Sequence, residues 1–97
     1  MMPACWIAHV TVTDPERHRG CMELAPAAFR RHGARFLARG GASDTLEGPE
    51  HQRHVLIEFP DLASARACWA SPEYAEARSM REGACVAQVC IVEGCSA

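Results

Sequence analysis

The sequence predicts a single α+β domain in which two strand–helix–strand units form one sandwich. Stretches rich in strand-forming residues alternate with helix-like stretches in the same order twice along the 97 residues. Both helix-like stretches end at an Arg-x-Gly-Ala motif, first at residues 31–34 and again at residues 81–84. Glycine is typical of a helix end because it adopts the left-handed conformation at little cost. An apolar, strand-like segment follows each motif.

The first unit begins with a strand over residues 5–13. An Asp-Pro-Glu sequence at residues 14–16 then supplies a helix N-cap, a first-turn proline and a first-turn acid. Apolar residues and histidines recur at helical spacing from His18 to His32, which predicts one core-facing stripe. Pro26 is expected to kink or split this helix near Leu24, because proline removes one backbone hydrogen bond and clashes with the preceding turn.

The second unit follows a hairpin with a long polar loop. A Ser-Pro-Glu sequence at residues 71–73 repeats the capping pattern, so the second helical region is expected to be two short pieces with a bend near Ala70. The predicted elements are a strand at 35–39, a strand at 54–59, helical pieces at 62–69 and 72–82, and a strand at 86–92.

This order is that of the ferredoxin-like βαββαβ sandwich, a four-stranded antiparallel sheet with two helices on one face. In this plan the first and third strands are central, and right-handed crossovers place both helices on the same side. The other sheet face also carries apolar residues and needs a cover. We therefore expect one domain over residues 1–97, with its core at about 4–94, that forms a homodimer in which two sheets pack into an α/β barrel.

Composition excludes several classes of protein. The net charge is −2 and the ten positive charges are scattered, so nucleic acid is not an expected partner. No apolar run approaches the roughly 20 residues of a membrane span, and no secretion signal is evident, so a cytoplasmic protein without membrane contact is expected. The six cysteines are then expected to stay reduced, and their spacing does not favour zinc.

Strand alternation selects three ionisable residues as a candidate site. His9, Arg39 and Glu58 each lie on the less apolar face of their strand if residues alternate regularly. In one interpretation Arg39 anchors a carboxylate or enolate as a substrate-binding residue, while His9 and Glu58 act as catalytic acid and base. In the other, Arg39 and Glu58 form a structural ion pair with His9 hydrogen-bonded beside it.

Two residues of the last helical piece extend this candidate site. Tyr74 and Arg78 are four residues apart, share a helix face and are predicted to bind substrate above the sheet. The alternative for Tyr74, and the more frequent role of a tyrosine at this helical position, is simple packing with its hydroxyl at the surface. His51 and His54 have no evident carboxylate partner at ligand spacing, so neither a metal nor a cofactor is expected.

Five segments resemble the domain-of-unknown-function 1330 family. The resemblance covers residues 5–94 and implies a ferredoxin-like dimeric α/β barrel, a superfamily that includes cofactor-independent monooxygenases, muconolactone isomerase-like enzymes and non-catalytic members. The segments are Trp6-Ile7-Ala8-His9-Val10, residues 35–41, Leu46-Glu47-Gly48, Ile57-Glu58-Phe59-Pro60 and Ser71-Pro72-Glu73-Tyr74. The family's characteristic positions correspond to His9, Arg39, Gly40, Gly41, Glu58, Tyr74 and Arg78.

Together these observations predict a cytoplasmic homodimer that binds a small anionic organic molecule between sheet and helices. Its chemistry would be cofactor-independent acid/base catalysis of the isomerase or monooxygenase kind. The alternative is a non-catalytic structural or accessory dimer with an internal His/Arg/Glu ion-pair network. A redox-responsive protein that uses Cys85 or Cys90 is a weaker possibility.

Overall fold

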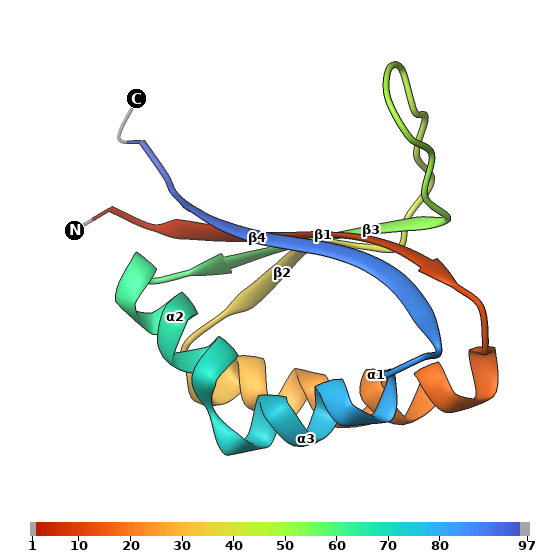
Figure 1. Ribbon diagram of the computed structural model, residues 1–97. Helices are drawn as coiled ribbons and strands as arrows, with labels where there is room; N and C mark the ends of the chain where they lie inside the picture. The colour runs from red at the N-terminus through yellow and green to blue at the C-terminus, as the bar shows by residue number, and fades with distance from the viewer. Residues whose placement is uncertain (1, 96–97) are drawn as a thin grey trace.

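Four antiparallel strands form one sheet, and every helix of the described chain covers the same face of it (Figure 1). The computed structural model describes residues 2–95. The elements, in order, are β1 (Ala4–Val12), α1 (Pro15–Arg31), β2 (Arg35–Arg39), β3 (Arg53–Phe59), α2 (Leu62–Ala70), α3 (Pro72–Met80) and β4 (Cys85–Glu93). This arrangement confirms the predicted α+β ferredoxin-like fold.

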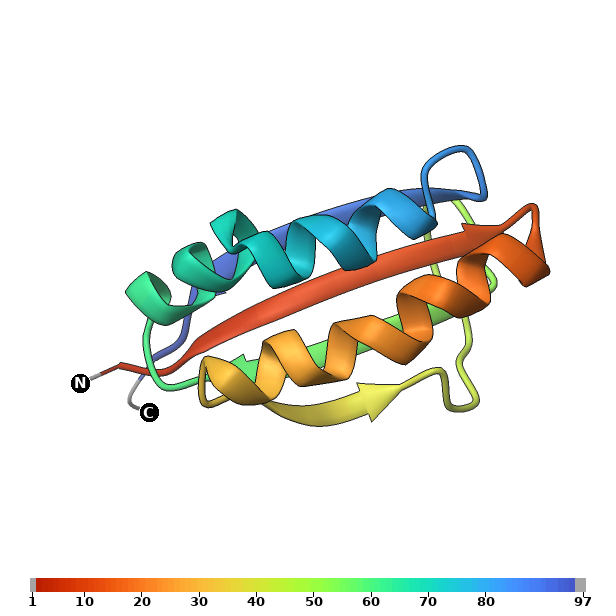
Figure 2. The same cartoon turned by 90° about the horizontal axis from the view of Figure 1, so that it is seen from below.

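The strand order across the sheet is β2-β3-β1-β4. The first and third strands are therefore central, as predicted. Seen from the helix side, α1 forms one row under the sheet and α2 with α3 forms a second row beside it (Figure 2). The predicted bend lies at Ser71, which is both the C-cap of α2 and the N-cap of α3. No helix among residues 2–95 has the length and apolar character needed to cross a membrane.

Helix α1 begins at its predicted cap, where the Asp14 side chain accepts a hydrogen bond from the Arg17 N–H at 3.3 Å. It then continues through Pro26 to Arg31 without interruption. Of the kink or split predicted near Leu24, the split therefore does not occur. Buried residues on both sides of the proline, among them Cys21 and Phe29, pack on the same core, and this packing outweighs the single lost backbone hydrogen bond.

Both Arg-x-Gly-Ala motifs contain a glycine in the left-handed region, with φ +75° at Gly33 and +74° at Gly83. At the end of α1, the N–H of Ala34 bonds to the carbonyl of Phe29, and the N–H of Gly33 bonds to the carbonyl of Arg30, both at 3.1 Å. This pattern is a Schellman motif. The repeated motif thus reverses the chain from helix to strand at both places.

A cluster of aromatic rings around Trp6 joins the sheet to the helices. Trp6 lies on central strand β1 and is only 2% exposed. Its ring makes edge-to-face contacts with Phe29 of α1 at 5.2 Å and Tyr74 of α3 at 5.0 Å between ring centroids. It also stacks on Phe59 of β3 at 5.8 Å. Large rings with these geometries contribute most of the apolar burial in a small core.

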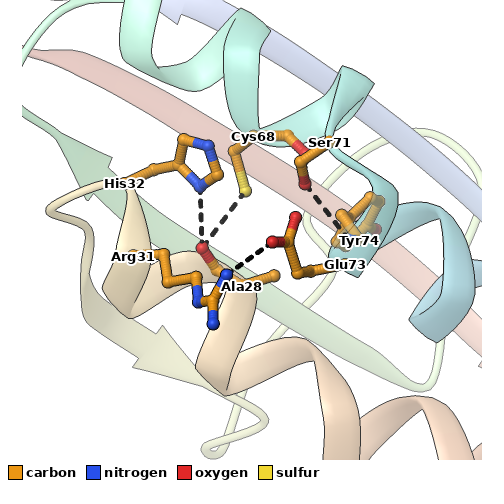
Figure 3. A network of polar contacts seen from close by, with 7 residues as sticks. All are labelled: Ala28, Arg31, His32, Cys68, Ser71, Glu73 and Tyr74. Carbon is orange, nitrogen blue, oxygen red and sulfur yellow. Dashed lines mark hydrogen bonds and ion pairs between the residues drawn. The ribbon is translucent and has the colours of Figure 1, made fainter.

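Polar contacts join the C-terminal end of α1 to the α2–α3 bend (Figure 3). The carbonyl of Ala28 accepts hydrogen bonds from His32 Nδ1 at 2.9 Å and from Cys68 Sγ at 3.8 Å. Burial, with a smaller effect of Glu73, raises the pKa of Cys68 to about 11, so this thiol keeps its proton and remains a donor. An exposed ion pair between Arg31 and Glu73, at 2.6 Å, lies beside these contacts.

Replacing Gly33 tests the helix-end motif. We expect Gly33→Ala to lower the free energy of unfolding by about 1 kcal/mol or more, because alanine is strained at positive φ. A Cβ at this position would also lie 3.0 Å from Pro60 Cγ. For a domain of this size the melting temperature should fall by roughly 4–8 °C per kcal/mol.

Gly41→Ala is the matched control, since a Cβ there meets no atom within 4 Å. Thermal unfolding followed by circular dichroism at one fixed protein concentration provides the measurement. Equal melting temperatures for the two variants would contradict the proposed role of Gly33.

Candidate functional site

His9 and Glu58 lie on the sheet face that no helix covers, which we call the open face. Along β1, Trp6 and Ala8 are buried beneath the helices, whereas His9 points to the opposite side and is half-buried. His9 Nδ1 is 2.7 Å from Nδ1 of His54, its partner across β1 and β3. One ring of this pair must donate and the other accept. His9 therefore has a partner within its own chain.

A β-bulge in β2 alters the alternation on which the predicted site depended. Phe36 and Ala38 pair with consecutive residues of β3, so Leu37 is an extra residue in β2. The bulge shifts the residues after it by one position relative to the sheet faces. Arg39 consequently lies opposite Val55, on the helix side of the sheet.

The predicted grouping of Arg39 with His9 and Glu58 on one face is therefore wrong. The guanidinium of Arg39 lies over the Phe36 ring, with Cζ 4.4 Å from the ring centroid. The alternative ion pair between Arg39 and Glu58 is also wrong, because Glu58 Oε1 accepts a 2.8 Å hydrogen bond from Arg35 Nε.

A cavity of about 90 Å³ lies between the sheet and the helices. Aromatic rings, including Trp6 and Phe29, hold the two layers apart, and the neighbouring Ala8, Ala25 and Ala87 are too small to fill the space. Most of the lining is apolar. The other side chains that line it are His18, Cys21, Arg39, Arg53, Tyr74 and Arg81.

Three guanidinium groups line this cavity and no carboxylate does. Arg39 contacts the Phe36 ring, and Nη1 of Arg53 lies 3.6 Å from the sulfur of Met22. Within residues 2–95, neither these arginines nor Arg81 forms an ion pair; the carboxylates that do are Glu58 and Glu73, on other surfaces. The cavity therefore has an uncompensated positive charge.

Tyr74 and Arg81 interact at the α3 side of the cavity. Tyr74 is 4% exposed, and burial raises its pKa, although the hydrogen bond with Arg81 opposes the shift. The same hydrogen bond raises the pKa of Arg81 against the opposing effect of burial. Tyr74 therefore keeps its proton at neutral pH and presents an O–H group, while Arg81 stays charged.

Arg78 does not share the cavity with Tyr74. Its guanidinium lies over the ring of Trp69, with Cζ 4.2 Å from the centroid, and the cavity lining does not include it. Of the five predicted site residues, the structure thus brings Arg39 and Tyr74 to one cavity. His9 and Glu58 lie across the sheet, and Arg78 lies outside.

Sequence reasoning did not select His18, Arg53 or Arg81 for the site. The helical spacing places His18 on the apolar stripe of α1 and therefore predicts a core residue. A histidine on such a stripe is, however, also a signal for a polar group that lines a cavity. Arg81 belongs to the repeated helix-end motif. Arg53 precedes the predicted third strand and alternates with Val55, which places it on the helix side once the strand is extended by one residue.

The loop between β2 and β3 rises from the open face, away from the helices (Figure 1). It borders a cleft of about 720 Å³ whose floor includes His9 and His54, with His51 at the end of the loop. His51 Nδ1 is 3.2 Å from Thr11 Oγ1. Residues 2–95 contain no cluster of three or more His, Cys, Asp or Glu residues arranged to hold a metal ion.

Solved structures with the same fold include proteins of unknown function and a described oxygenase. A protein of unknown function from Rhodopseudomonas palustris has a TM-score of 0.78 at 18% identity, over 99% of this chain and 85% of that one. A dimeric ferredoxin-like protein of unknown function from Jannaschia sp. has a TM-score of 0.66 at 14% identity, over 93% and 98% of the two chains. SnoaB, a cofactor-independent oxygenase from Streptomyces nogalater, has a TM-score of 0.61 at 13% identity, over 100% and 97%.

At sequence identities this low, the structural similarity shows a shared fold and does not show a shared function. The comparison with curated proteins found no match. The family described as Domain of unknown function (DUF1330), in contrast, matches residues 3–95, nearly the whole sequence. The chain therefore belongs to the DUF1330 family.

Proposed function

We propose that this protein is a cytoplasmic homodimer that binds a small organic anion in the cavity between sheet and helices. One observation carries the proposal: three arginines line a mostly apolar cavity that contains no carboxylate. Arg39 is exposed and Arg53 and Arg81 are half-buried, so all three positive charges are accessible to a counter-charge from solvent. A bound anion would supply that counter-charge.

The size of the cavity limits the ligand. A volume of about 90 Å³ is far below that of a typical drug-sized pocket, so only a ligand of a few non-hydrogen atoms can be enclosed. Apolar walls favour a hydrocarbon body, and guanidinium groups favour a carboxylate, which they bind through two parallel hydrogen bonds. A short-chain carboxylic acid satisfies both requirements.

Arg39 is the proposed anchor because it is exposed at the rim, where a carboxylate can enter, while its planar group is held over Phe36. Tyr74 forms part of the inner wall and offers its O–H group. Arg78, predicted as a further binding residue, has no role in this proposal because it stacks on Trp69. His9 and Glu58 cannot reach a ligand in the cavity through the sheet.

The open face supports a second role, the contact between two copies of the chain. It exposes apolar side chains such as Val86 (61% exposed) and Val92 (49% exposed), and Leu46 at 94% on the protruding loop. Two of its ionisable residues are already paired, His9 with His54 and Glu58 with Arg35, so burying these two costs less. The Jannaschia protein of the same fold is described as dimeric. These pairs also favour a structural role for His9 and Glu58.

Removing the anchor should weaken anion binding selectively. We expect Arg39→Gln to raise the Kd for butyrate about tenfold, a loss of about 1.4 kcal/mol, because a charged hydrogen bond is removed. Arg35→Gln is the matched control, since Arg35 lies on the same strand but on the open face. NMR titration with butyrate, and with neutral butyramide for comparison, provides the measurement.

Two results would contradict the role of Arg39. One is equal butyrate affinity in wild type and Arg39→Gln; the other is butyramide binding as tight as butyrate binding.

A charge on the open face should separate the dimer. Leu56 lies on β3 opposite Ile7 on this face, so we expect Leu56→Glu to shift the protein to monomers. Leu24→Glu is the control, because Leu24 is an exposed leucine on α1, across the sheet from the open face. Sedimentation velocity measures the outcome. A wild-type monomer, or an intact Leu56→Glu dimer, would disprove sheet-to-sheet association.

A further inference from the structure

His18 is a buried imidazole that faces the cavity without a hydrogen-bond partner. It lies near the start of α1, is 7% exposed and lines the cavity. Its backbone N–H bonds to the carbonyl of Asp14 at 3.0 Å, whereas its ring forms no hydrogen bond with another residue in 2–95. No fully buried side-chain nitrogen or oxygen in 2–95 lacks a hydrogen-bond partner, so the unpaired ring nitrogens of His18 are still accessible. The ring is therefore available to a molecule in the cavity.

The surroundings of His18 favour its neutral form. Burial lowers its pKa, and the positive charges of Arg53 from β3 and Arg81 after α3 lower it further. Cys21 and Tyr74 also face the cavity, but burial raises the pKa of each, so both keep their protons. Among the groups that line the cavity, His18 alone combines a lone pair on nitrogen with a neutral charge at pH 7.

We infer that His18 is the catalytic base of the cavity and that the substrate is a small carboxylic acid with an enolisable carbon beside a ketone. This inference rests on the proposed anion site. The substrate carboxylate would bind Arg39 at the rim. The ketone would then lie deeper, among the guanidinium groups of Arg53 and Arg81.

The proton transfer balances without an oxidant or a cofactor. The neutral nitrogen of His18 takes a proton from the carbon beside the ketone, and the C–H bond breaks. Its electron pair forms the C=C bond of an enolate, whose negative oxygen is stabilised by a guanidinium group. The enolate also offsets the charge of the new imidazolium. Return of the proton, to the same carbon or to a conjugated one, completes an exchange or an isomerisation.

Deuterium exchange measures this step without knowledge of the natural substrate. The probe is 2-oxobutyrate, a small carboxylate with an enolisable CH₂, followed by proton NMR in D₂O. We expect wild-type protein to accelerate the exchange of this CH₂ at least tenfold over buffer. His18→Gln should return the rate to that of buffer while butyrate affinity changes less than threefold. His32→Gln, at the C-terminal cap of α1 and outside the cavity, should exchange like wild type.

The pH profile separates a base from a merely structural histidine. At 2-oxobutyrate concentrations far below saturation, the exchange rate should rise with pH to a plateau, with its midpoint below about 6.5, the ordinary histidine value. NMR titration of the His18 ring in wild type should give the same midpoint, and butyrate should shift it upward. This titration needs no variant, so it tests the role of His18 as the base even if His18→Gln fails to fold.

The outcomes distinguish this inference from the proposed function. Butyrate binding without accelerated exchange would overturn the role of His18 and leave the anion site standing. Exchange that persists in His18→Gln, or a His18 pKa at or above the ordinary value, would also overturn it. Failure of butyrate to bind wild type would overturn the anion site, and the inference with it.

Discussion

The packing of Trp6 is the contact on which the two layers depend. Its ring touches residues of α1, α3 and β3 at once, so a single side chain of the central strand fixes the height of the helices above the sheet. Interiors are usually filled to near-crystalline density. Here the alanines beside this cluster cannot span the height that the large rings impose. The cavity is thus a consequence of aromatic residues alternating with very small ones in the same core.

The ionisable side chains on the two faces of the sheet differ in whether they have partners. On the open face, the carboxylate of Glu58 has its arginine and the two histidines have each other. On the helix side, three guanidinium groups and one imidazole surround an apolar space without an acidic partner. Because Arg39 is exposed and Arg53 and Arg81 are half-buried, these cations can be reached by an anion from solvent. We therefore assign ligand chemistry to the helix side and self-association to the open face, a division that reverses the first expectation for His9 and Glu58.

The sequence was sufficient to predict the order of elements, the central strands, the α2–α3 bend and both helix ends, because capping residues, glycines and apolar periodicity are local signals. The site was predicted less well for a specific reason. The bulge at Leu37 has no glycine or other local mark, and it depends on pairing with a strand about twenty residues away. Regular alternation consequently placed Arg39 on the wrong face. His18 was missed because its helical position looks the same whether it fills a core or lines a cavity.

A crystal structure of the protein with butyrate tests the central claim most directly. The account predicts density for the ligand between sheet and helices, with its carboxylate within hydrogen-bond distance of the Arg39 guanidinium and its hydrocarbon chain directed toward Tyr74 and His18. An Arg39 side chain on the open face, paired with Glu58 over a cavity closed by side chains, would contradict both the bulge geometry and the anion site built on it.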